Sequence, residues 1–348
     1  MFPTLIEKLR RQEDLSTDEA AGAMATIMKG EATPAQIAGL LIGLAMKGER
    51  PAELVGLART MRDNAVAVPA QQGLVFDTCG TGGDRSGTFN ISTAAAIVLA
   101  ACGVRVAKHG NRSVSSQCGS ADVLEALGVN VEATPHVIAE CLRDVGIAFF
   151  FAPTFHPAMR HAAQARKDLG VRTAFNLLGP LTNPARPTRQ IVGVPRPDLT
   201  ELLARSLALL GSERAWVVHG ADGLDELSTT GYTKVSECRG NSVQTFYVHP
   251  AEFGLSKATP ESLKGGDATT NAAIVRGVLD GEAGNPRDVV LLNAGAALFV
   301  AAHADTVRAG IANAAAAIDS GAARQVLARL VSVSTGGPKP APAKGAGA

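Results

Sequence analysis

The sequence predicts an α/β protein in which a small N-terminal helical domain precedes a larger domain built on a mainly parallel central sheet. Residues 1 to about 70 place apolar side chains three and four positions apart, which is the helical period. From about residue 71, short apolar runs alternate with helical stretches, a pattern typical of parallel sheets with crossover helices. With 46% hydrophobic residues among 348, the chain can bury a sizeable core.

Capping signals divide the N-terminal region into helices. Ser16 and Glu19 form a capping box, Thr33 and Pro34 open the next helix, and Pro51 opens the last one. The helix that follows Pro34 is apolar around much of its circumference. Two explanations fit this observation, because the helix is either enclosed by its own domain or forms a dimer interface.

The α/β domain is expected to span residues 71–333. We expect strands at 74–80, 104–110, 129–133, 147–153, 189–194 and 214–220, a hairpin at 231–249 and helices over 271–333. Residues 160–188 interrupt the alternation with a helical half and a Gly/Pro-rich half, and we interpret them as an excursion that returns to the helical domain. The Pro/Gly/Ala/Lys tail from 334 to 348 is predicted to be disordered.

Composition and charge argue against several classes of protein. A formal charge of +1 and 4% aromatic residues disfavour nucleic-acid binding, which needs clustered cations and stacking platforms. The longest strongly apolar stretch, residues 94–104, is about half of the ~20 residues that span a bilayer, so we expect no membrane partner. The N-terminus lacks an apolar signal core, and the five cysteines show no CxxC spacing. Both observations favour a cytoplasmic protein with buried thiols.

Two polar loops are predicted to bind phosphate groups. Residues 77–93 lie between a strand and a helix, and residues 108–128 follow a strand and lead into a helix. In both places free backbone N–H groups can meet an anion. The first loop is rich in glycine but matches neither the dinucleotide fingerprint nor the Walker motif, and the alternative for it is a flexible turn. In that loop Asp84 is suited to a ribose hydroxyl or to a metal-bound water. The second loop carries Lys108 and Arg112 among hydroxyl and amide side chains, and Ser120 is its predicted N-cap.

Other candidates are less specific on their own. His109 suits either general acid–base chemistry or a positioned structural imidazole, and we favour the structural role. His156 is a possible accessory pocket residue, while Arg166 and its neighbours on the excursion suit either a carboxylate or the surface. Asp225 and Glu226 follow a predicted strand, and adjacent carboxylates beside two anion loops suit Mg²⁺ with a diphosphate. Together these features indicate group transfer from an activated diphosphate.

Residues 1 to about 333 resemble the anthranilate phosphoribosyltransferase family of tryptophan biosynthesis, which shares its nucleoside phosphorylase/phosphoribosyltransferase-like fold with the pyrimidine nucleoside phosphorylases. The resemblance rests on long motifs in matching order: GTGGD at 80–84, NIST at 90–93, KHGNRSVSS at 108–116, GSADVLEALG at 119–128, RTAFNLLGPLTNPA at 172–185 and GLDELS at 223–228. It implies that the chain joins 5-phosphoribosyl 1-diphosphate (PRPP) to the amine of anthranilate, giving N-(5-phosphoribosyl)anthranilate and diphosphate, with Mg²⁺ as cofactor. It also implies a homodimer formed through the helical domain.

The resemblance further implies which residues form the site. The implied PRPP contacts are Gly80, Gly83, Asp84, Thr88, Asn90, Ile91, Ser92, Thr93, Lys108, His109, Gly110, Asn111, Arg112, Ser113, Val114, Ser115, Ser116 and Ser120. The implied anthranilate contacts are Gly80, Asn111 and Arg166, and the implied magnesium ligands are Ser92, Asp225 and Glu226. No dedicated catalytic acid or base is implied, because an aromatic amine is already largely unprotonated at neutral pH.

The chain departs from the family at Gln117-Cys118, where Lys-Ser is frequent. The change removes one positive charge beside the second phosphate loop and is expected to loosen PRPP binding. Two rival functions remain to be compared with the structure. A nucleoside phosphorylase would carry different glycine and lysine motifs. A non-catalytic nucleic-acid-binding relative is disfavoured by the near-zero charge and the intact Asp225-Glu226 pair.

Overall fold

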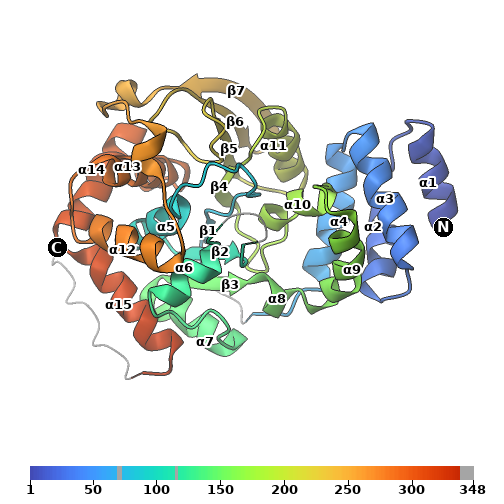
Figure 1. Ribbon diagram of the computed structural model, residues 1–348, viewed down its shortest axis with the longest axis horizontal. Helices are drawn as coiled ribbons and strands as arrows, with labels where there is room; N and C mark the ends of the chain where they lie inside the picture. Colours follow the sequence, from blue (N-terminus) through green and yellow to red (C-terminus); the bar gives the residue numbers. More distant parts are fainter. Residues whose placement is uncertain (69–72, 114–116, 338–348) are drawn as a thin grey trace.

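The computed structural model describes residues 1–68, 73–113 and 117–337, and it shows a helical domain beside a larger domain built on one sheet (Figure 1). The sheet is parallel except for its last two strands. The predicted fold class is therefore confirmed. The expected boundary between the two domains falls on residues 69–72, which lie outside the described residues. The tail predicted from 334 starts too early, because Ser334 is buried at the end of the last helix, and residues from 338 onward lie outside the described residues.

Four N-terminal helices form the body of the helical domain. They are α1 (Phe2–Arg10), α2 (Thr17–Met28), α3 (Pro34–Lys47) and α4 (Pro51–Asp63). The capping signals read from the sequence are present. The Ser16 hydroxyl accepts a hydrogen bond from the Glu19 N–H at 3.1 Å, while the Glu19 carboxylate accepts one from the Ser16 N–H at 2.8 Å. Thr33 and Gln36 repeat this reciprocal arrangement at the start of α3.

Short helices from the middle of the chain lead into and join this domain. They are α8 (Ala152–Phe155), α9 (Arg160–Leu169) and α10 (Ala174–Leu177). Helix α9 packs against α2 and α3, and α10 packs against α3, so the two lie beside the N-terminal helices (Figure 1). The buried side chains of Ala162, Ala165 and Phe175 belong to the same apolar cluster as those of α1–α4. The chain thus runs out of the sheet domain, contributes to the helical domain and returns.

The sheet has seven strands in the order β3-β2-β1-β4-β5-β6-β7. Their bounds are β1 (Phe76–Asp77), β2 (Val106–Gly110), β3 (Ile147–Phe151), β4 (Arg189–Gly193), β5 (Arg214–Gly220), β6 (Thr233–Arg239) and β7 (Ser242–Val248). Strands β2 and β3 lie on one side of β1, and the chain then crosses to place β4 on the other side. Because the order reverses at β1, the carboxyl ends of β1 and β4 form the topological switch point, the position at which α/β proteins bind their ligands.

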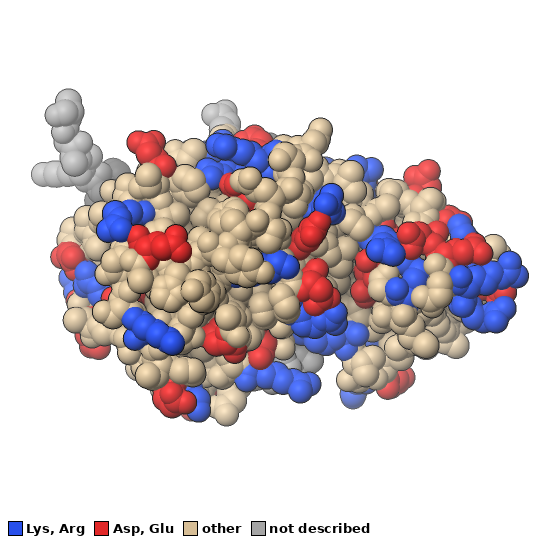
Figure 2. Space-filling model, turned by 90° about the horizontal axis from the view of Figure 1, so that it is seen from above, with Lys and Arg blue, Asp and Glu red and all other residues tan. Residues whose placement is uncertain are grey.

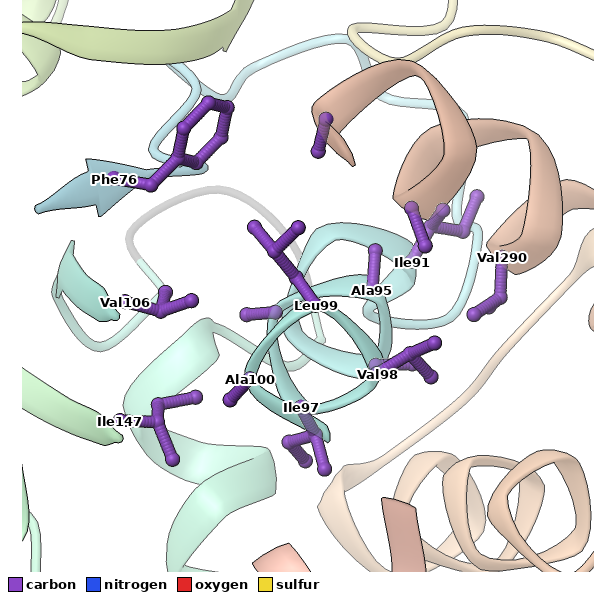
Figure 3. Packing of buried hydrophobic residues seen from close by; sticks show 14 of the residues in the cluster. Phe76, Ile91, Ala95, Ile97, Val98, Leu99, Ala100, Val106, Ile147 and Val290 are labelled. Atoms are coloured by element: carbon purple, nitrogen blue, oxygen red, sulfur yellow. The ribbon is translucent and has the colours of Figure 1, made fainter. Parts of the chain in front are cut away.

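Helices cover the sheet and build the main core. The bounds are α5 (Ile91–Ala101), α6 (Ser120–Ala126), α7 (Pro135–Glu140), α11 (Leu199–Leu209), α12 (Ala268–Leu279), α13 (Asn285–Val300), α14 (Val307–Asp319) and α15 (Ala322–Ser334). Phe76, Val106 and Ile147 extend from β1–β3 toward Leu99 of α5, while Val290 of α13 packs on another side of that helix (Figure 3). Helix α5 is buried all round, as its almost wholly apolar sequence requires.

One expected strand is wrong. Residues 129–133 form turns between α6 and α7 instead of a strand. Val129 and Val131 are nevertheless buried, so their alternation reflects packing against the core. Backbone N–H groups at this point bind side chains. The Asn130 N–H donates to Ser334 Oγ, and the Glu132 N–H donates to Asn130 Oδ1. These local and helical contacts replace the hydrogen bonds that a neighbouring strand would supply.

Candidate active site

Three loops converge at one edge of the sheet. Residues 78–90 follow β1, the described residues 111–113 and 117–119 follow β2, and residues 221–230 follow β5, so each loop begins at the carboxyl end of a parallel strand. The Asp225 N–H points to Asp84 Oδ2 at 3.4 Å, and the Ser92 N–H donates to Glu226 Oε1 at 3.0 Å. The loop after β5 (residues 221–230), which we call the acidic loop, is therefore in direct contact with the loop after β1 (residues 78–90) and the helix start that follows it. We call the loop after β1 the glycine-rich loop.

Gly193, the last residue of β4, lies where these two loops meet. The Thr81 N–H donates to the Gly193 carbonyl oxygen at 2.9 Å. A Cβ atom on Gly193 would stand 1.5 Å from the Asp225 carbonyl oxygen, and one on Gly80 would stand 3.2 Å from the Gly193 oxygen. Because glycine has no side chain, the two loops can pack backbone against backbone.

Asp84, Asp225 and Glu226 form the acidic part of the site. Asp84 is held by Ser86, whose hydroxyl donates to Oδ2 at 2.7 Å and whose N–H donates to Oδ1 at 3.2 Å. Burial raises the pKa of Asp225 well above its ordinary value, and the charges of Asp84 and Glu226 raise it further. Burial also raises the pKa of Glu226 to about 7, although the charge of Lys108 opposes this shift. A bound cation would stabilise the ionised form of these carboxylates.

Lys108 extends the same network from the middle of β2. Its ammonium group donates to Thr78 Oγ1 at 3.1 Å and to Ser92 Oγ at 3.4 Å, and the side chain is buried. Ser92 also binds Glu226 through its backbone N–H. The residues Asp84, Asp225, Glu226, Ser92 and Lys108 are thus linked in an unbroken series, which we call the acid–lysine chain.

Acidic side chains of α6 and the turn after it hold the loop that follows β2. Asp122 Oδ2 accepts hydrogen bonds from the Gly119 N–H at 2.7 Å and from the Ser113 N–H at 3.1 Å. Arg112 donates to Glu125 Oε1 at 2.8 Å, so a carboxylate neutralises the charge that the sequence assigned to a phosphate. The predicted contacts Val114, Ser115 and Ser116 lie outside the described residues.

The predicted N-cap at Ser120 is wrong by one residue. Gly119 is the N-cap of α6, and Ser120 is the first helical residue. The side chain of Asp122 receives the Gly119 N–H, and a Cβ at position 119 would stand 2.4 Å from the Ser113 nitrogen, so glycine occupies the cap. Ser120 still lies beside the loop, since its hydroxyl donates to the Asn111 carbonyl oxygen at 3.3 Å.

The remaining predicted PRPP contacts lie around these loops. The Thr88 and Ser86 hydroxyls are 3.1 Å apart. Ile91 and Thr93 are buried in the first turn of α5, and Gly110 ends β2. Asn90 is the N-cap of α5. The departure at Gln117-Cys118 is near, because Asn90 Nδ2 donates to the Cys118 carbonyl oxygen at 3.3 Å.

His109 and His156 form a buried pair where β2 meets the segment leading to the helical domain. Their ring centroids are 5.3 Å apart in an edge-to-face arrangement. His109 Nδ1 lies 2.9 Å from the Gly179 carbonyl oxygen. His109 Nε2 and both ring nitrogens of His156 have no partner in hydrogen-bonding geometry among the described residues. Burial lowers the pKa of His109 to about 3 and that of His156 to about 4, so both imidazoles are neutral at pH 7.

Arg172, and not Arg166, contacts the glycine-rich loop. Arg172 follows α9 and donates to the Thr81 carbonyl oxygen at 3.1 Å, and its guanidinium lies 1.8 Å from the position that a Cβ on Gly83 would take. Gly83 has a φ of 87°, a conformation that favours glycine. Arg166 is exposed on α9, with its guanidinium 5.7 Å from the centre of the Phe175 ring.

Sequence reasoning missed Gly193, and it gave Arg172 only the alternatives of a carboxylate or the surface that it gave Arg160 and Arg166. An isolated glycine inside a strand is typical of a place where another backbone comes close, and Gly193 in the run IVGV carries that signal. Arg172 carries no comparable local signal, because its partner Thr81 is 91 residues away along the chain.

The donor set fits a metal ion that is shared with a ligand. Within the described ranges, no three His, Cys, Asp or Glu side chains converge closely enough to hold an ion by themselves. Mg²⁺ in proteins is commonly held by one or two carboxylates, with waters and substrate phosphate oxygens completing its shell. Asp225 and Glu226 supply such a carboxylate pair, and a cation beside them would favour their ionised forms against the burial that raises both pKa values.

The surface gives no indication of a polyanionic partner on the face that Figure 2 presents. Lys and Arg side chains are interspersed there with Asp and Glu instead of forming a stripe of one sign (Figure 2). None of the helices in the described part of the chain has both the length and the apolar character needed to cross a membrane.

Comparison with known proteins covers both domains. Residues 72–324 match the model of the glycosyl transferase family α/β domain, and residues 3–65 match that of the family's helical bundle domain. Anthranilate phosphoribosyltransferase of Syntrophobacter fumaroxidans is 55% identical over 326 residues, covering 94% of this chain and 97% of that protein. The enzyme of Moorella thermoacetica is 54% identical over 331 residues, with coverages of 95% and 98%.

Solved structures agree with these matches. The crystal structure of anthranilate phosphoribosyltransferase from Thermus thermophilus has a TM-score of 0.90 and 44% identity, covering 95% of this chain and 99% of that one. The Saccharomyces cerevisiae enzyme in complex with PRPP and Mg has a TM-score of 0.88 and 27% identity, covering 96% and 98%.

Proposed function

The chain belongs to the anthranilate phosphoribosyltransferase family and transfers the phosphoribosyl group of PRPP to the amine of anthranilate in tryptophan biosynthesis, and from this premise we propose how its residues divide that reaction. The observation that carries the proposal is the acid–lysine chain. It places three carboxylates and a buried ammonium group at the carboxyl ends of the strands, where the strand order reverses.

Asp225, Glu226 and Ser92 would hold Mg²⁺, with PRPP oxygens completing its shell. The fit rests on the raised pKa values of the two carboxylates and on the contact between Ser92 and Glu226. The bound ion would offset the negative charge that develops on the leaving diphosphate. The Saccharomyces cerevisiae relative has been solved with both PRPP and Mg, which supports the same requirement here.

The loops after β1 and β2 would bind PRPP. The proposed contacts are Gly80, Gly83, Asp84, Thr88, Asn90, Ile91, Ser92 and Thr93 in the first loop, and Lys108 through Ser116 with Ser120 in the second. Exposed backbone at the glycines and the positive end of α5 suit phosphate groups. Lys108 is the proposed cation for the diphosphate, since Arg112 is already paired with Glu125. Asp84 is suited to a ribose hydroxyl or a metal-bound water.

Anthranilate would bind between the two domains. We propose that Arg166 receives its carboxylate, because a guanidinium binds a carboxylate through two parallel hydrogen bonds. Asn111 and Gly80 would contact the same substrate from the sheet domain. The unpartnered nitrogens of His109 and His156 support a polar ligand here, since buried polar atoms are nearly always hydrogen-bonded.

The reaction depends mainly on alignment of the anthranilate amine with ribose C1. The bond from ribose C1 to a diphosphate oxygen breaks, and its electron pair leaves with the diphosphate. The amine lone pair of anthranilate forms the new bond to C1, and the amine then releases one proton. Lys108 stabilises the leaving group electrostatically, and Arg166 orients the nucleophile toward C1. Neutral imidazoles at His109 and His156 would shape the pocket without adding a positive charge beside C1.

We also propose a cytoplasmic homodimer that forms through the helical domain. Helix α3 buries one face in its own domain through Ile37, Leu40, Leu41 and Leu44. On its outer side, Ile42 is half-buried and the Met46 side chain is 78% exposed. A second copy would cover this apolar strip. Sedimentation equilibrium should give a dimer for the wild type and a monomer for Ile42→Glu, and a wild-type monomer would refute the proposal.

A fluorescence assay tests the reaction. Anthranilate fluorescence should fall only when purified protein, PRPP and MgCl₂ are all present, because the product lacks the free primary amine. Omitting each component in turn is the control. Phosphate-dependent cleavage of thymidine or uridine, without loss of anthranilate, would instead identify a nucleoside phosphorylase.

A further inference from the structure

Buried asparagines in the described part of the chain gather around the proposed site. They are Asn183, Asn271 and Asn293, exposed by 0%, 1% and 4%. A buried primary amide is tolerated only when its oxygen and its NH₂ group find hydrogen-bond partners. Asn183 lies between β1 and β2, where its Nδ2 donates to Asp77 Oδ2 at 2.8 Å and to the Ala107 carbonyl oxygen at 2.7 Å. Asn271 projects from α12 and Asn293 from α13, and both helices lie outside the loops of the proposed site.

Asn293 projects from α13 to the acidic loop. Its Oδ1 accepts a hydrogen bond from the Leu227 N–H at 3.0 Å, and its Nδ2 donates to the Leu227 carbonyl oxygen at 2.9 Å. Nδ2 also donates to the Val289 carbonyl oxygen at 2.9 Å. One carboxamide thus satisfies both backbone groups of Leu227, as a neighbouring strand would. Leu227 directly follows Glu226. Any movement of the backbone that carries the carboxylate pair would therefore break these hydrogen bonds.

Asn271 projects from α12 to the glycine-rich loop. Its Nδ2 donates to Asn90 Oδ1 at 3.0 Å, and its Oδ1 accepts a hydrogen bond from the Gly266 N–H at 2.8 Å. Asn90 in turn donates to the Cys118 carbonyl oxygen. Asn271 therefore fixes the side chain of the α5 N-cap, two residues before Ser92.

The two asparagines serve different loops of one site. Asn293 acts on the residue that follows the proposed metal ligands, whereas Asn271 acts on the cap of the phosphate-binding helix. Both are buried to a similar degree and lie on helices of the same domain, so removing either side chain leaves similar unsatisfied groups in the interior. If substitution of Asn293 and substitution of Asn271 change metal binding and PRPP binding differently, the two residues have positioning roles. Equal changes would indicate general destabilisation.

We propose that Asn293 and Asn271 are positioning residues for phosphoribosyl transfer: Asn293 sets the Asp225-Glu226 pair for the metal, and Asn271 sets the start of α5 for PRPP. The inference rests on the proposed function of these loops. Among the described hydrogen bonds, neither side chain contacts the acid–lysine chain directly. Asn293 acts through Leu227, and Asn271 acts through Asn90.

The test compares Asn293→Ala with Asn271→Ala in the full-length protein. Mn²⁺ binding is measured by electron paramagnetic resonance with saturating PRPP and no anthranilate, because PRPP oxygens complete the proposed metal shell. The KM for PRPP is measured at saturating MgCl₂. Outer residues that orient metal ligands typically change metal affinity by about 10- to 100-fold, so Asn293→Ala should weaken Mn²⁺ binding at least about tenfold. Asn271→Ala should leave Mn²⁺ binding within about twofold and raise the KM for PRPP about tenfold. Thermal melting of both variants measures the shared loss of stability.

Asp225→Asn separates this inference from the proposed function. If Asp225→Asn loses Mn²⁺ binding while Asn293→Ala keeps the wild-type affinity, the metal site stands and the positioning role is refuted. If Asp225→Asn binds Mn²⁺ as the wild type does, the proposed metal site fails and the role of Asn293 fails with it. Equal shifts of both readouts in both asparagine variants would also overturn the inference. Should Asn293→Ala fail to fold, Asn293→Ser should show a smaller shift in the same direction, and an unchanged affinity would refute the role.

Discussion

The two sides of the proposed site differ in how completely their polar groups are satisfied. On the PRPP side, Asp84 and Lys108 have hydrogen-bond partners supplied by the loops themselves. On the anthranilate side, His156 is buried with both ring nitrogens unpartnered within the described part of the chain, and Arg166 is exposed.

This contrast indicates two ways of building one site. The PRPP side lies within a single domain and is organised before ligand binds, which suits electrostatic stabilisation of a leaving group. The proposed anthranilate side would lie between the domains, where a ligand or a domain movement would complete its hydrogen bonds. Substitutions on the PRPP side should therefore reduce activity steeply, whereas those on the anthranilate side should change one substrate's binding or the protein's stability.

The largest effect is expected from Asp225→Asn. Removing one carboxylate charge from the proposed metal pair should lower kcat/KM for PRPP by about 10²- to 10³-fold at fixed MgCl₂. Steady-state kinetics measure this loss, and a higher MgCl₂ concentration should recover part of it. The exposed Asp305→Asn is the matched control and should behave as the wild type. A loss smaller than about threefold would contradict the assigned role.

Gly193→Ala tests whether the PRPP side depends on close backbone packing. The added Cβ would fall 1.5 Å from the Asp225 carbonyl oxygen, so the acidic loop must move. A misplacement of about 1 Å can cost about 10²-fold in rate, and we expect kcat/KM to fall by roughly that factor. Gly231→Ala is the control, because a Cβ there meets no atom within 4 Å. Wild-type kinetics for Gly193→Ala would show that the loops tolerate a shift.

Arg166→Ala examines the anthranilate side. Losing a charge-assisted hydrogen bond to a carboxylate should raise the KM for anthranilate at least about tenfold and leave the KM for PRPP within about twofold. Arg160→Ala, also exposed on α9, is the control. Equal changes in both KM values would count against a specific role for Arg166.

His156→Leu tests whether the buried imidazole costs stability in acid. The pKa of His156 is about 4 in the folded protein, below the ordinary 6.5, so folding excludes a proton between these pH values. As pH falls from 6.5 to 4, the wild type should lose stability relative to His156→Leu by up to about 1.4 kcal/mol per pH unit. Above pH 6.5 the difference should be constant.

Urea unfolding of both proteins across this pH range measures the difference. Asp77, whose pKa burial raises to about 6, titrates in both proteins and cancels in the comparison. A pH-independent difference would show that His156 is protonated in the folded state or reaches solvent.

The sequence by itself determined the elements whose causes are local. The capping box at Ser16, the turn at Gly240 and the glycine-rich loop after β1 all arise from residues within a few positions of one another. These signals could be recognised in the sequence because the hydrogen bonds that create them close within one turn of chain. The motif resemblance identified the family from the same local stretches.

Only the tertiary structure decided which residues meet. Val129 and Val131 alternate like strand residues, yet the N–H groups of Asn130 and Glu132 donate to side chains and not to a neighbouring strand. Arg172 forms a hydrogen bond with Thr81, which is 91 residues away along the chain, and Asn293 forms one with Leu227, which is 66 residues away. These contacts depend on the order of the strands across the sheet. That order is set by packing of the whole chain, and short-range spacing carries no record of it.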